Sequence, residues 1–93
     1  MKYEIKLTAQ FKKDIKLAKK QKKNLDKIFL VIDKIANGEK LDEKYKDHEL
    51  SGNYKGVREC HIEPDWLLMY EIVDDILVLV LNRVGSHSDL FKR

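Results

Sequence analysis

Three histidines, an aspartate and an arginine are the residues of this sequence best suited to moving protons and binding anions. Unperturbed imidazoles titrate near pH 6.5, so a group of them can exchange protons at neutral pH. The histidines lie outside the segments with helical periodicity, in a long loop, at a strand end and after the last strand. Each alone is an ordinary surface residue, but together they indicate a site where loops and strand ends converge. The five residues are His48, His61, Asp65, Arg83 and His87.

The stretch HIEPDW (61–66) joins two strand-like segments through a proline turn. Pro64 fixes φ and Asp65 favours turn geometry, so a type I turn accounts for both without a functional role. That interpretation leaves His61 unexplained. Because side chains alternate along a strand, Cys60 points to one face and His61 to the other. If Cys60 faces the helices, it is a small core residue and His61 emerges on the opposite face.

The sequence lacks the spacings that hold a metal or cofactor in known motifs. Its single cysteine can form no internal disulfide, and no CxxC or HExxH pattern occurs. The glycines are too scattered for a phosphate-binding loop. We therefore expect no metal and no cofactor, although a metal site that uses all three histidines stays open as an alternative.

The elements that must position these residues begin with a strand and two helices. Alternating polar and apolar residues predict a strand over 2–7, and apolar residues at helical spacing predict helices over 9–21 and 25–36. A residue able to cap a helix precedes each of them. The buried faces are expected to contain Phe11, Ile15 and Ala18 in the first helix and Leu25, Ile28, Phe29, Ile32, Ile35 and Ala36 in the second.

Three strands are expected in the second half of the chain. Residues 39–54 show no sustained period and predict a long loop, and strand-like segments follow at 55–62, 66–73 and 76–84. This order predicts one α+β domain over residues 1–93, with a two-helix hairpin packed on one face of a mostly antiparallel four-stranded sheet. The last strand is apolar on both faces, which is typical of a central strand. Since two helices cover one face, the other must meet the tail, the loop or another protein.

Charge is distributed unevenly along the chain. The net charge is +3, yet residues 1–24 carry nine lysines against two acidic residues. A basic end of this kind favours a polyanionic partner such as RNA, although a solvated helix face explains it equally well. The sequence shows no signal peptide and no apolar run of about 18 residues that could span a membrane, so we expect a cytoplasmic protein.

Residues 45–91 carry several ordered motifs: KDH, L-x-G-x-Y-K-G-x-R, H-I-x-P-D-W and R-x-G-x-H-x-x-L-F. In this order they resemble the YafQ branch of the RelE/ParE superfamily, the toxins of type II toxin-antitoxin pairs. The resemblance implies a ribosome-dependent endoribonuclease that cuts mRNA in the ribosomal A site and is blocked by a cognate antitoxin. Its active site would consist of His48, His61, Asp65, Arg83, His87 and Phe91. Tyr54 stands where the family often has tryptophan.

The implied reaction suits these residue types. Metal-free RNA cleavage needs a base for the 2'-OH, a cation for the crowded phosphorane and an acid for the departing 5' oxygen. Arg83 could bind the phosphate, Asp65 or a histidine could be the base, and His87 the acid. Contacts to substrate are expected from Phe91, Trp66, Arg58 and Lys46. Two alternatives remain: a ParE-like toxin that binds gyrase without catalysis, and a metal-dependent hydrolase.

Overall fold

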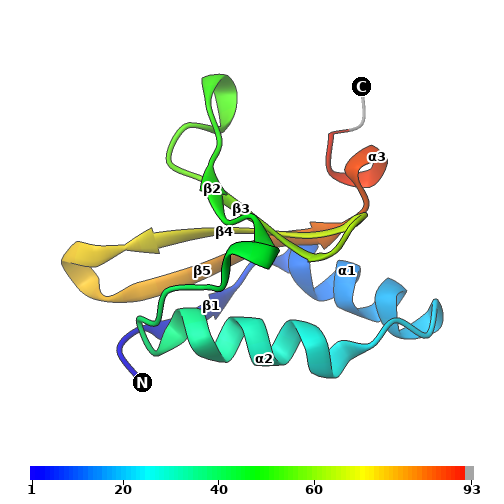
Figure 1. Ribbon diagram of the computed structural model, residues 1–93, viewed down its shortest axis with the longest axis horizontal. Coiled ribbons are helices and arrows are strands. Elements are labelled where there is room, and N and C mark those ends of the chain that lie inside the picture. Colours follow the sequence, from blue (N-terminus) through cyan, green and yellow to red (C-terminus); the bar gives the residue numbers. More distant parts are fainter. Residues whose placement is uncertain (92–93) are drawn as a thin grey trace.

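The computed structural model describes residues 1–91 as a five-stranded sheet with two long helices against one face (Figure 1). The strands are arranged in the order β1-β5-β4-β3-β2. They are β1 (Glu4–Leu7), β2 (His48–Glu49), β3 (Arg58–Glu63), β4 (Trp66–Val73) and β5 (Val78–Gly85), and the helices are α1 (Ala9–Lys20), α2 (Leu25–Ala36) and α3 (His87–Leu90). The predicted α+β class, with a helical pair on one face, is confirmed.

The sheet has one more strand than predicted. β1 pairs with β5 in parallel and the other three pairings are antiparallel, so the mostly antiparallel character is confirmed. The fifth strand is β2, in which His48 pairs with Glu59 at the edge of the sheet. A strand of two residues is too short to show alternation, so the sequence pattern of 39–54 gives no sign of it.

Several element boundaries agree with the sequence and others move. α2 and β4 begin and end at the predicted residues, and α1 ends one residue early. β5 begins at Val78 because a short 3-10 turn, Asp74–Ile76, and Leu77 with a φ of 50° form the join from β4. β5 nevertheless lies between β1 and β4, the interior position that its apolar character predicts.

The helices begin at caps and bury most of the predicted stripes. The Thr8 hydroxyl accepts a hydrogen bond from the Phe11 amide at 2.9 Å, and the Asn24 side chain accepts one from Asp26. Phe29 is an exception, because 51% of its surface is exposed while Val31 is fully buried in its place. Phe29 and Val31 are two residues apart, about 200° around the helix, so they lie on opposite sides and only one of them can face the sheet. Within residues 1–91, no helix is long and apolar enough to cross a membrane.

Apolar side chains fill both faces of the sheet. The larger cluster lies between the two long helices and the sheet and includes Tyr70, Leu79 and Leu81. On the other face, Leu67 and Met69 pack against Leu90 of α3. Leu50 and Val57, from the segment between β2 and β3, and Phe91 of the tail pack against the same cluster. Figure 1 shows α3 and the loop after β2 standing on the face opposite the long helices. The tail and the loop therefore cover part of the sheet face that the two long helices do not cover.

Candidate active site

The alternation of β3 places Glu59 and His61 on the face opposite Cys60. Cys60 is fully buried in the larger cluster, and burial raises the pKa of its thiol to about 12. This confirms Cys60 as a core residue and leaves it unsuited to be a nucleophile. His61 is only partly buried and emerges on the other face, as predicted.

A buried carboxylate lies between two of the histidines. Glu59 is 4% exposed, and its Oε1 is 3.6 Å from His61 Nε2 and 3.7 Å from His48 Nε2. These distances exceed those of a hydrogen bond but allow attraction when an imidazole is protonated. Among the described residues, Glu59 Oε2 is the one buried side-chain polar atom that has no hydrogen-bond partner. Sequence reasoning missed Glu59, although it shares a strand face with His61 at a spacing of two.

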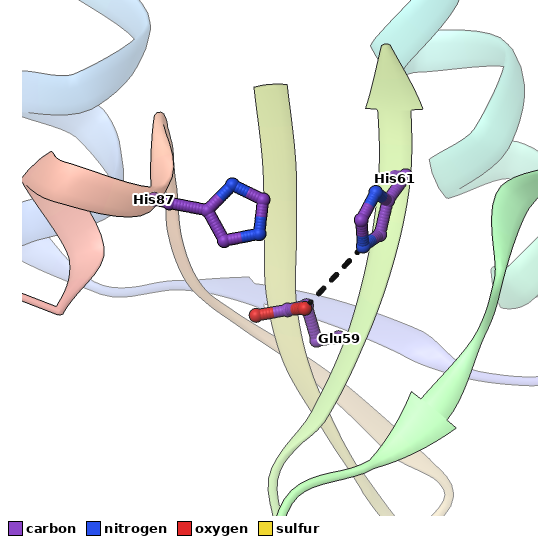
Figure 2. A group of neighbouring side chains, drawn as sticks. All are labelled: Glu59, His61 and His87. Carbon is purple, nitrogen blue, oxygen red and sulfur yellow. Dashed lines mark ion pairs between the residues drawn. The ribbon is translucent and has the colours of Figure 1, made fainter. Parts of the chain in front are cut away.

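The third histidine joins this group from the start of α3. Asp65 Oδ1 accepts two hydrogen bonds from His87, one from the backbone amide at 2.9 Å and one from the ring Nδ1 at 2.7 Å. These two bonds lower the pKa of Asp65. The imidazoles of His61 and His87 are 5.6 Å apart, edge to face, and Figure 2 shows them facing each other with Glu59 between and below. With Nδ1 donating to Asp65, His87 Nε2 is left to exchange protons.

Arg83 bonds to residues of α1 and α3 and, among residues 1–91, to none of the imidazoles. Its Nε and NH2 groups donate to the two carboxylate oxygens of Asp14 at 3.1 and 3.0 Å, and its NH1 donates weakly to the Asp89 carbonyl at 3.5 Å. The bond to Asp14 raises the pKa of Arg83. Asp65 thus pairs with His87, and Arg83 pairs with Asp14 of α1.

Arg58 also has an internal partner. Its guanidinium contacts the Asp47 carboxylate at 3.2 Å, and the same carboxylate accepts a hydrogen bond from the hydroxyl of Tyr70 at 2.5 Å. Asp47 directly precedes His48, whose Nδ1 donates to the Lys46 carbonyl at 2.7 Å. Arg58 therefore holds the loop that carries His48, and its contact with substrate stays a prediction. Lys46 is exposed.

The two predicted aromatic contacts differ from each other. Trp66 is 2% exposed and belongs to the larger core cluster, so its ring has no free face on which a base could stack. Phe91 is partly buried and packs against the smaller cluster, and its ring meets Tyr54 edge to face at 5.5 Å. Phe91 therefore packs partly into the smaller cluster, and its contact with substrate stays a prediction.

Two hollows flank the tip of the β3–β4 hairpin. The larger, of about 940 Å³, lies between α1 and the hairpin and is lined by Asp65 and Arg83. The smaller, of about 400 Å³, lies between α2, the segment 44–46 and the hairpin, and it opens onto His61. Both have the size of small-ligand sites, about 300–1,000 Å³. The hairpin tip thus has space on either side, next to Asp65 and Arg83 on one side and next to His61 on the other.

The facing histidines could also hold a metal. One donor atom each from Glu59, His61 and His87 lies within 4.8 Å of the other two. Two imidazoles and a carboxylate suit zinc or copper, and the unpartnered Oε2 of Glu59 supplies a free oxygen. The sequence predicted no metal, and the spacing of these residues along the chain matches none of the usual ligand motifs.

Comparisons with known proteins assign the chain to one family. A family described as "Bacterial toxin of type II toxin-antitoxin system, YafQ" matches residues 3–92. The chain is 42% identical over 89 residues to the mRNA interferase toxin YafQ of Escherichia coli K12, and the match covers 95% of each chain. The putative toxin YafQ of Haemophilus influenzae is 36% identical over 84 residues, covering 85% of this chain and 82% of the relative.

Solved structures show the same fold. The YafQ chain of the E. coli DinJ-YafQ toxin-antitoxin complex superimposes with a TM-score of 0.88 at 38% identity, over 98% of this chain and 99% of the other. A metal-bound toxin from Helicobacter pylori gives a TM-score of 0.91 at 42% identity, over 98% and 100%. Both likenesses extend over nearly the whole length of each chain. The chain therefore belongs to the YafQ family of type II toxin-antitoxin toxins.

Proposed function

We propose that this toxin is an mRNA interferase, an endoribonuclease that cuts mRNA in the ribosomal A site. The observation that carries the proposal is the pair of facing imidazoles, His61 and His87, one beside Glu59 and the other bound to Asp65. A toxin that acts only by binding a protein such as gyrase has no need of such a pair. The relatives named mRNA interferase toxin YafQ support the same activity.

The proposed reaction is attack by a 2'-OH on the neighbouring phosphorus. The base removes the hydroxyl proton, the 2' oxygen bonds to phosphorus, and the bond to the 5' oxygen breaks. An acid gives its proton to that leaving oxygen, so the products are a 2',3'-cyclic phosphate and a 5'-OH. Two imidazoles in opposite protonation states can perform both transfers at neutral pH.

The hydrogen bonds favour one division of roles. Asp65 accepts twice from His87 and has a lowered pKa, so it is better suited to orient His87 than to remove a proton from substrate. His87, oriented by its Nδ1 bond to that carboxylate, then serves as the acid through Nε2. His61 is the base, and Glu59 beside it stabilises the positive charge that the ring gains. His48 donates through Nδ1 to a backbone carbonyl and adds charge near Glu59 rather than a proton transfer.

Arg83 would stabilise the phosphorane. A guanidinium has five N–H donors. Two donate to Asp14 and one weakly to a carbonyl, which leaves two for phosphate oxygens. Because Asp14 fixes the plane of the guanidinium, the two free donors keep a constant direction, which favours binding of a planar pair of oxygens.

The partners follow from charge and from the relatives. The outward face of α1 would dock on ribosomal RNA through exposed lysines at positions 12, 13, 16, 19 and 20. A cognate antitoxin would bind the toxin and block the hairpin-tip site, as a partner is present in the DinJ-YafQ complex. The proposed chemistry uses no metal. A zinc or copper ion held by Glu59, His61 and His87 would occupy the ring nitrogens that exchange protons.

The test is cleavage of a defined mRNA on programmed ribosomes, with mapped ends. Asp65→Asn and His87→Ala should lower the rate at least about a hundredfold, the usual size of a lost acid or base. Asp33→Asn, at an exposed position of α2, is the matched control and should leave the rate unchanged. A message with a 2'-deoxy sugar at the cut position should resist cleavage. Cleavage of that message, or full activity of both site variants, would exclude the proposal.

A further inference from the structure

The smaller hollow has features that the proposed catalytic residues do not use. It is lined by Lys27, Leu30, Lys44, Tyr45, Lys46 and His61, and its volume is about 400 Å³. We call it the side groove. One end opens onto the imidazole proposed as the base, and the other reaches the exposed apolar surface of α2, where Leu30 is 54% exposed. A ligand at the His61 end of the side groove would therefore lie beside the proposed base.

The side groove is positive, whereas the larger hollow is balanced. Three lysines and one acid, Glu63, line the side groove, and that acid already pairs with Lys27 at 3.1 Å. The larger hollow has four cationic residues and four acidic ones in its lining. Lys44 and Lys46 have no acidic partner within 4.0 Å among residues 1–91, and both side chains are exposed. An anion therefore meets a net positive lining in the side groove, which the larger hollow does not offer.

The wall that carries these lysines is fixed in place. Tyr45 packs against the larger core cluster on one side of Lys46, and Asp47 is bonded to Arg58 and Tyr70 on the other. The carbonyl of Lys46 accepts the Nδ1–H of His48 at 2.7 Å. The backbone of the groove is thus tied both to the core and to a histidine of the site, so it needs little ordering when a ligand binds.

The geometry points to the side groove as the subsite for the nucleotide next to the cleaved phosphodiester. Its phosphate would lie against Lys44 and Lys46, and its base against Tyr45, Leu30 and Pro64. Apolar walls with a few charged groups at one end are the usual form of a site for a nucleotide-sized ligand. This inference rests on the proposed function, because it takes RNA as the substrate. An acidic antitoxin segment would meet the same charge, but it has no reason to end at an imidazole.

The direct test is binding of a three-nucleotide RNA with 2'-O-methyl sugars, which cannot be cut, followed by amide shifts in NMR. The parent should show shifts at Leu30, Tyr45 and Lys46. Lys44→Ala/Lys46→Ala should weaken binding about tenfold or more, and the slope of log K against log salt should fall by about 0.7 for each lost phosphate contact. Lys6→Ala/Lys40→Ala removes equal charge at exposed positions and should bind as the parent does.

Cleavage on programmed ribosomes separates this inference from the proposed function. The Lys44→Ala/Lys46→Ala protein should show a KM raised about tenfold with kcat within about threefold, since binding is lost and the imidazoles remain. No binding, shifts confined to α1, or equal binding by this variant overturns the subsite. If this variant instead loses only its affinity for the antitoxin, the side groove is an antitoxin site. A parent that binds the RNA in the groove but never cuts mRNA refutes the proposed function and keeps the subsite.

Discussion

Replacement of Asp14 by alanine should destabilise the protein, because this aspartate joins α1 to β5. Asp14 is 8% exposed, and its carboxylate accepts hydrogen bonds from Arg83, from the Val84 amide at 3.1 Å and from the Gln10 side chain at 3.1 Å. Removing one partner of a buried ion pair costs about 3–5 kcal/mol. The Arg83 side chain is 32% exposed and can regain water, which lowers that cost. The Val84 amide is buried and loses its acceptor, which costs about 1–3 kcal/mol.

These terms place the loss for Asp14→Ala at about 3–4 kcal/mol. Asp14→Asn keeps an acceptor oxygen but loses the charge, and should cost about half as much. Since a domain of this size has about 5–15 kcal/mol of stability, Asp14→Ala should still fold at low temperature. Each kcal/mol corresponds to roughly 4–8 °C in Tm for a domain of 60–100 residues, so its Tm should fall by at least about 12 °C.

The assay is urea unfolding monitored by circular dichroism. An unchanged m-value would show that the variant differs from the parent in its free energy of unfolding alone. Asp33→Ala removes an exposed aspartate from α2 and should change stability by less than about 0.5 kcal/mol. A double-mutant cycle with Arg83→Ala should give a coupling above about 1.5 kcal/mol. A loss below about 1 kcal/mol for Asp14→Ala, or additivity in the cycle, would refute the reasoning that this pair joins α1 to β5.

Three further predictions concern the site and the core. The lowered pKa of Asp65 should place its carboxyl midpoint in NMR below the ordinary value of about 3.9, and His87→Ala should raise that midpoint. The Asp65–His87 contact therefore stabilises the fold above the ordinary carboxyl pKa and is lost as pH falls through the lowered one. The Cys60 thiol, with its pKa of about 12, should react with iodoacetamide at neutral pH only as fast as the protein opens, and fast reaction in native buffer would contradict its burial. Added zinc should inhibit cleavage and Glu59→Gln should weaken that inhibition, whereas a chelator alone should leave the rate unchanged.

The sequence predicts well what depends on neighbouring residues. The ends of α2 and β4 follow from a cap, a helical stripe and a proline turn, all of which act over a few residues. The alternation in β3 likewise places Cys60 in the core and His61 opposite it. Such signals are local because they arise from backbone geometry alone.

The contacts that determine the site are not local. Asp14 and Arg83 are 69 positions apart, and Asp65 and His87 are 22 apart, so no spacing rule connects them. The family motifs in residues 45–91 indicate which residues belong to the site, but they do not indicate which of these residues form hydrogen bonds or ion pairs with one another. Glu59 shows the remaining gap, because a single acid in a strand carries no motif and its burial between histidines depends on β2, which the sequence pattern does not reveal.

The bond between Asp14 and Arg83 also couples the position of α1 to the arginine that we propose as the phosphate-binding cation. The guanidinium is joined to the middle of the helix by two hydrogen bonds, so tilting or lifting α1 would carry the arginine with it. The imidazoles belong to β3 and to the start of α3 and would stay where they are. A protein that binds the outer face of α1 and moves this helix would thus inhibit the proposed reaction. It would separate the Arg83 guanidinium from the imidazoles of His61 and His87 without contacting either histidine.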